Sequence, residues 1–124
     1  MFYMGASCHL VQDVTIPQHA NVELLHNHRS FENWIIKMHR RFYRFRAFKG
    51  GIYFNSISRY IELNSREAVR THEKYSYIEN EHIRFYKITS VILVMAQKTT
   101  AGVMVKFYYD MQKLKAIMMI KLQH

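Results

Sequence analysis

The stretch Gly51–His72 carries three arginines and a histidine, Arg59, Arg66, Arg70 and His72. Its first residues alternate aromatic and β-branched side chains with polar ones, a pattern typical of a half-buried strand. The polar part that follows predicts an extended arm reaching away from a sheet. Guanidinium groups bind phosphate oxygens through paired hydrogen bonds. We therefore expect this arm to become ordered against a polyanion.

A second group of cations lies in residues 29–49, which hold seven Lys or Arg and one acid, Glu32. This region contributes +6 to a formal net charge of +9. Aromatic residues stand among the cations, as in Phe42–Arg46, and such mixtures favour RNA because aromatic rings stack on unpaired bases. The cations predicted to contact RNA in this region are Arg29, Arg40, Arg41 and Arg44.

Metal binding and catalysis are the alternatives for the remaining reactive side chains. His26 and His28 form a close pair with His39 beyond them, but a zinc site needs three or four ligands and no others occur at a recognisable spacing. Cys8 beside His9 is the best nucleophile candidate, with His72 as another possible base, and no phosphate-binding loop is present. We predict no enzyme activity, no metal, no cofactor and no small-molecule substrate.

The elements that would position these residues follow the order β-α-β-β-α-β. This order predicts an α+β ferredoxin-like sandwich with a long extended hairpin arm and an extra C-terminal helix. Ser30 and Asn80 are expected to cap the two main helices. In chain order we expect a strand at Asn21–Leu25, a helix from Ser30 ended by Gly50 and Gly51, a strand at Gly51–Ser58, the arm from Arg59 to Ala68, a strand at Val69–Ile78, a helix from Asn80 to about Thr99, a strand at Val103–Tyr109, and a helix from Asp110.

Length and composition suit one domain. We expect an N-terminal extension at residues 1–20 and a single domain at residues 21–124, with its arm at residues 59–70 and its last helix at residues 110–123. A single cysteine allows no intramolecular disulfide. The longest uncharged apolar run, Ile88–Gln97, is ten residues long, so no membrane span and no membrane partner are expected.

Several short motifs resemble a known ribosomal family. The run Ser58–Glu67 followed by Arg70–His72, the pair His28–Arg29, and the run Ala101–Val105 are similar in order and spacing to motifs of the tenth protein of the small ribosomal subunit. The resemblance extends from about Asn21 to Tyr109.

This resemblance implies a structural component of the small-subunit head, binding ribosomal RNA and neighbouring head proteins. It implies that the arm penetrates folded RNA, with Arg66 and Arg70 as the first contacts and Arg59, His72 and Arg29 next. The abundance of His, Tyr and Met favours a mitochondrial ribosome, or a cytoplasmic one if the source is bacterial. Two alternatives are a stand-alone ferredoxin-like RNA-binding module and an RNA-free accessory subunit of a large organellar assembly, whose basic stripe meets acidic protein or lipid headgroups.

Overall fold

The computed structural model describes residues 2–15, 17 and 28–124. In these residues the chain forms four α-helices, one short 3₁₀ helix and no β-strand. The elements are α1 (Phe2–Asp13), α3 (His28–Met38), the 3₁₀ helix η2 (Tyr43–Phe45), α4 (Ile57–Tyr75) and α5 (Glu81–Leu122).

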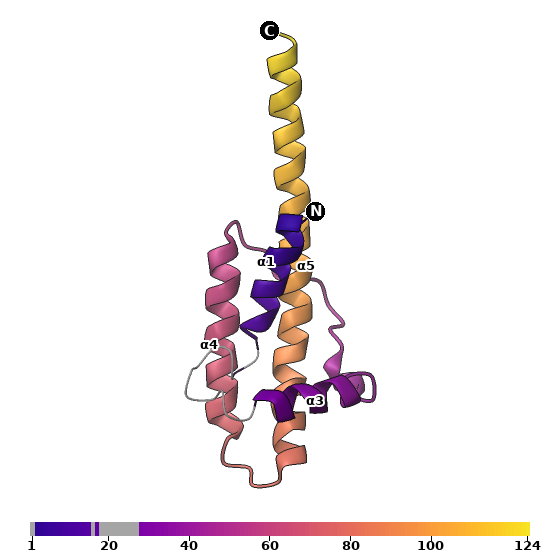
Figure 1. Ribbon diagram of the computed structural model, residues 1–124, viewed down its shortest axis with the longest axis vertical. Helices are drawn as coiled ribbons and strands as arrows, with labels where there is room; N and C mark the ends of the chain where they lie inside the picture. The colour runs from indigo at the N-terminus through magenta and orange to yellow at the C-terminus, as the bar shows by residue number, and fades with distance from the viewer. Residues whose placement is uncertain (1, 16, 18–27) are drawn as a thin grey trace.

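The long helix α5 organises the molecule. Its first half packs against α1 and α4, and α3 crosses the lower part of this bundle (Figure 1). The second half of α5 extends beyond the bundle without a neighbour among the described helices. At 42 residues, α5 is about 63 Å long.

The predicted ferredoxin-like fold is wrong. The predicted strand Gly51–Ser58 is mostly irregular chain leading into α4, and α4 replaces both the arm and the strand Val69–Ile78. The predicted first strand, Asn21–Leu25, lies outside the described residues.

The helical period of α4 escaped prediction because half of its buried stripe is polar. Tyr60, Asn64, Ala68 and Thr71 are four, four and three residues apart and are all buried. This spacing places them on one face of a helix. Asn64 and Thr71 made the stripe look like solvent-exposed chain, while the alternation of apolar and polar residues elsewhere suggested strands.

The expected break at Thr99–Gly102 does not occur either. α5 passes through it, so the predicted strand Val103–Tyr109 is helical, and residues 110–122 continue the same helix. Asp110 is therefore no N-cap; its carboxylate pairs with Lys106 one turn earlier. The predicted cap at Asn80 is confirmed, since its side chain accepts a hydrogen bond from the Ile83 amide at 3.0 Å.

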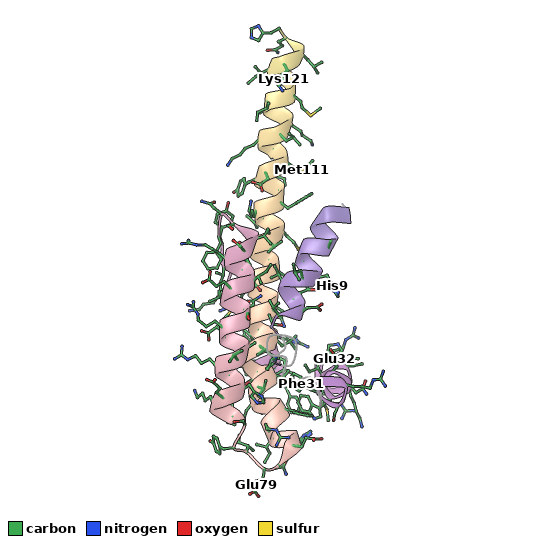
Figure 2. The ribbon with its side chains drawn as sticks, turned by 60° about the vertical axis from the view of Figure 1, so that its left-hand side comes forward. His9, Phe31, Glu32, Glu79, Met111 and Lys121 are labelled. Carbon is green, nitrogen blue, oxygen red and sulfur yellow. The ribbon has the colours of Figure 1, made fainter. Side chains whose placement is uncertain are left out.

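Helix α3 begins at His28, two residues before the predicted cap Ser30, and ends at Met38, well before Gly50. Its apolar stripe is nevertheless directed inward. Phe31 is fully buried, and its ring lies 4.9 Å from that of Phe85 on α5. Figure 2 shows Phe31 between α3 and the bundle, with Glu32 on another side of α3.

Two buried clusters hold the helices together along α5. One joins α3 to α5 through Phe31, Phe85, Ile88 and Ile92. The other joins α1, α4 and α5 through Val11, Tyr60 and Val103. The N-terminal residues predicted to form an extension thus include a helix that contributes to the core.

Candidate nucleic-acid interface

The last two residues of α3 and the chain that follows them are strongly basic. We call residues 37–49 the basic segment; it contains no Asp or Glu. Its six cations are all exposed: Lys37, Arg40, Arg41, Arg44, Arg46 and Lys49.

Aromatic side chains anchor the basic segment on α5. Phe45 is 1% exposed, and Phe42 and Phe45 lie with ring centroids 4.9 and 5.5 Å from that of Tyr86. The Gln97 side chain holds the backbone on both sides of Arg46, donating to the Phe45 carbonyl at 2.6 Å and accepting from the Ala47 amide at 2.9 Å. The middle of the segment, from Phe42 to Ala47, is therefore anchored on α5, while its cations are exposed.

Two aromatic rings of the basic segment face solvent. Tyr43 is 72% exposed and Phe48 is 68% exposed, and their ring centroids are 5.2 Å apart. Exposed rings next to arginines form a surface on which unpaired bases can stack while the guanidinium groups bind the adjacent phosphates.

The cations of the basic segment are not neutralised within the described part of the chain. None of the six makes an ion pair there, and the ion pairs that do occur involve other residues. Six uncompensated charges in 13 residues create a strong local positive potential, which attracts a polyanion.

The arginines of α4 have a different environment. Arg59, Arg66 and Arg70 are exposed on α4, but carboxylates lie among them. Glu62 lines a shallow hollow together with Arg59 and Arg66, and Glu67 lies 3.8 Å from Arg70. The guanidinium group of Arg59 also covers the ring of Phe54 at 5.9 Å.

The predicted RNA-contacting residues therefore fall into separate groups. Arg40, Arg41 and Arg44 lie together in the basic segment, and Arg29 is exposed at the start of α3. The α4 arginines lie apart from these residues, on a helix that runs alongside α5 while α3 crosses it (Figure 1). Arg46 and Lys49 were not among the predicted contacts, although the charge pattern of the sequence indicates them. Nothing in the sequence indicated that Gln97 would hold the backbone of the basic segment.

His72 belongs to neither group. It is half-buried, and its Nδ1 atom has no hydrogen-bond partner among the described residues. Burial, reinforced by the positive charge of Arg84, lowers the pKa of His72, and Glu73 opposes this only in part. These surroundings suit a neutral imidazole inside the fold better than a cationic RNA contact.

This environment predicts an acid-sensitive contribution to stability. Because the pKa of His72 is lower in the folded state, the unfolded chain binds the proton first as the pH falls below about 6.5. The stabilisation from neutral His72 is thus present at pH 7.5 and is lost on acidification. We expect His72→Gln to shrink the drop in melting temperature between pH 7.5 and 5.5, as measured by circular dichroism. His39→Gln, at an exposed position, is the control. An unchanged drop in the His72→Gln variant would contradict the prediction.

The other reactive side chains do not assemble into a site in the described part of the chain. Burial raises the pKa of the Cys8 thiol, which leaves less thiolate at neutral pH. The Nε2 atom of His9 lies 3.3 Å from the carboxylate of Asp13. No group of three metal-ligating side chains occurs among the described residues. His26 lies outside these residues, and the position of the His28 side chain is also not described.

Helix α5 is long and apolar enough to cross a membrane by length and composition. Its most apolar stretch has a mean hydropathy of 1.5, and a third of that stretch is buried inside the protein. The core helix of a soluble protein meets the same criterion, so the expected absence of a membrane partner stays a prediction.

Comparisons of the chain with protein-family models, with curated proteins and with solved structures found no match.

Proposed function

We propose that this protein is a non-catalytic RNA-binding protein whose basic segment, residues 37–49, contacts single-stranded or looped RNA. The observation that carries the proposal is the set of six exposed cations without an ion-pair partner among the described residues, on a backbone anchored by Phe45 and Gln97. A fixed backbone limits the conformational entropy that binding would otherwise cost.

Arginine and aromatic content favour RNA over other anionic surfaces. Four of the six cations are arginines, which bind phosphate in a bidentate geometry and stack on bases. Tyr43 and Phe48 add two exposed rings within the same segment. Lipid headgroups offer phosphate but no flat base for these rings.

A role in the small ribosomal subunit is one specific case of RNA binding, but the ferredoxin-like fold expected for it is absent from the described residues. The family resemblance rests on short motifs that are similar in order and spacing, but the extended arm that it implies, at Arg59–Arg70, is part of the helix α4. RNA contact is therefore assigned to the basic segment in place of the α4 arginines. Sedimentation of an extract before and after EDTA treatment tests whether the RNA is that of a small ribosomal subunit.

Two triple variants test the proposal with equal changes in charge. Arg40→Gln/Arg41→Gln/Arg44→Gln removes three cations from the basic segment, and we expect it to weaken binding to a fluorescent 20-nucleotide single-stranded RNA at least tenfold. The salt dependence should also become weaker. The plot of log K against log salt has a negative slope, and its magnitude should decrease by about 2, because each lost phosphate contact removes about 0.7. Fluorescence anisotropy at several salt concentrations measures both quantities.

The control is Arg59→Gln/Arg66→Gln/Arg70→Gln, which removes the same charge from α4. We expect it to change the dissociation constant less than threefold. Equal weakening by both variants would mean that net charge alone drives binding and would contradict the proposed site. Binding to anionic vesicles that is as tight as binding to RNA would contradict the choice of partner.

A further inference from the structure

The projecting half of α5 carries an apolar stripe with regular spacing. Its members are successively three or four residues apart and lie along one face of the helix. We define the apolar stripe as Met104, Phe107, Met111, Leu114 and Met118. Four of these side chains are 38–56% exposed, and Phe107 is half-buried. Figure 2 shows Met111 on the part of α5 that has left the bundle.

The apolar stripe continues into a groove on the bundle. The groove, of about 520 Å³, is lined on α5 by residues including Leu93, Ala96, Thr100 and Met104, which extend the same spacing backwards. The end of α1 and Ile35 of α3 form its walls. Groove and stripe together span residues 93–118 of α5, a length of about 38 Å. The surface therefore follows one side of α5 over about seven helical turns.

Charge defines the kind of helix that fits. Helical geometry places Lys115 on one border of the apolar stripe and Lys121 on the other. Neither has an ion-pair partner in the described residues, whereas Asp110, the one acid after residue 103, is already paired with Lys106. The borders of the stripe therefore offer positive charges for which α5 supplies no free carboxylate.

We propose that the groove and the apolar stripe bind an amphipathic helix of a partner protein, with apolar residues at three- and four-residue spacing and acidic residues along both borders. Such a helix would bury the methionine and aromatic side chains and pair its carboxylates with Lys115 and Lys121. Methionine side chains adapt to the shape of a partner, which suits a helix-binding surface. The groove meets the basic segment at Gln97, which lines the groove and holds the backbone of Phe45 and Ala47. The proposal itself does not depend on RNA binding.

The other occupants fit less well. A second copy of this chain would supply no free carboxylate to Lys115 and Lys121, because Asp110, the one acid after residue 103, is already paired with Lys106. A membrane surface could cover the projecting half of α5, but a flat surface cannot enter the groove between α1, α3 and α5. The charged borders and the groove together therefore select an acidic helix.

Binding of two designed peptides to the full chain tests this proposal. Both are 26-residue helices with leucines at heptad a and d positions; one carries glutamates at the bordering positions and the other lysines. We expect micromolar binding of the glutamate peptide by fluorescence anisotropy and at least tenfold weaker binding of the lysine peptide. Equal binding of the two peptides, or no binding of the glutamate peptide at 100 µM, would overturn the proposal.

Two double variants locate the surface. Met111→Glu/Met118→Glu places charges in the apolar stripe and should weaken binding of the glutamate peptide at least tenfold. Ile117→Glu/Ile120→Glu adds the same charge on another exposed side of α5 and should change binding less than threefold. Three results would each refute the proposal. The first is an equal loss of binding from both variants, and the second is dimerisation in analytical ultracentrifugation that the peptide does not reverse. The third is tighter binding to anionic vesicles than to the peptide. Circular dichroism confirms that the variants remain folded.

Discussion

Replacing Asn64 with aspartate is expected to lower the free energy of unfolding by about 3–5 kcal/mol at neutral pH. Asn64 is 1% exposed at the junction of α1, α4 and α5. Its Nδ2 atom donates to the Val11 carbonyl at 2.9 Å and to the Thr99 hydroxyl at 3.0 Å. A carboxylate cannot donate, so it would face the Val11 carbonyl oxygen as a buried charge, and the Thr99 hydroxyl proton is already donated to the Met95 carbonyl at 2.9 Å.

The pH dependence identifies this mechanism. Burial would raise the pKa of the introduced carboxyl group in the folded state, so its penalty is absent below about pH 4, where both states are protonated, and grows as the pH rises. Urea unfolding of Asn64→Asp and of the wild-type chain at pH 4 and pH 7 measures the difference. Asn55→Asp, at an exposed position, is the control and should be nearly neutral at both pH values. A pH-independent loss at Asn64 would contradict a charge penalty.

Substituting alanine for Gly102 is expected to destabilise the fold by about 2–3 kcal/mol, although alanine favours helices. A Cβ atom at Gly102 would lie 1.7 Å from the Ile52 carbonyl oxygen and 2.7 Å from the Tyr60 hydroxyl. The segment around Ile52 would have to move away, and its amide would lose the 3.1 Å hydrogen bond to the Lys98 carbonyl. Thermal or urea unfolding measures the change.

A second glycine within a helix provides the matched control. Gly5 lies in α1, and a Cβ atom there would meet nothing within 4 Å. Gly5→Ala should therefore stabilise the protein by up to about 1 kcal/mol through helix propensity alone. Opposite signs for the two substitutions are the expected result; stabilisation by both would show that the contact between Ile52 and α5 is unimportant.

Sequence reasoning succeeded where local chemistry decides the structure. Asn80 starts a helix because its side chain accepts a hydrogen bond from an amide three residues later, and this signal is local. The apolar spacing of Phe31, Trp34 and Ile35 likewise predicted the buried face of α3, although the helix ends at Met38.

It failed where a tertiary contact decides. Gly102 resembles a helix terminator, yet its role is to let the backbone of Ile52 approach α5, and that contact involves residues 50 positions apart. Asn64 and Thr99 are polar residues that hydrogen-bond to each other in the core, so the buried face of α4 could not be recognised from hydrophobicity.

The candidate interface was predicted in part. Arg40, Arg41 and Arg44 followed from the density of cations and the absence of acids nearby, and the structure places them together. Arg59, Arg66 and Arg70 were grouped with His72 on or beside one predicted arm. On a helix the histidine is half-buried and the arginines are exposed among glutamates, a separation that follows from the helical period and not from residue type.

The two halves of α5 differ in how they reach the helical state. Starting a helix is unfavourable because the first turn fixes several residues for one hydrogen bond, whereas each further residue adds one bond. The half packed against α1 and α4 supplies that first turn, and the projecting half only propagates from it. A substitution that melts the bundle at Asn64 or Gly102 therefore also removes the template for Met111 and Met118, although both side chains are exposed on the projecting half.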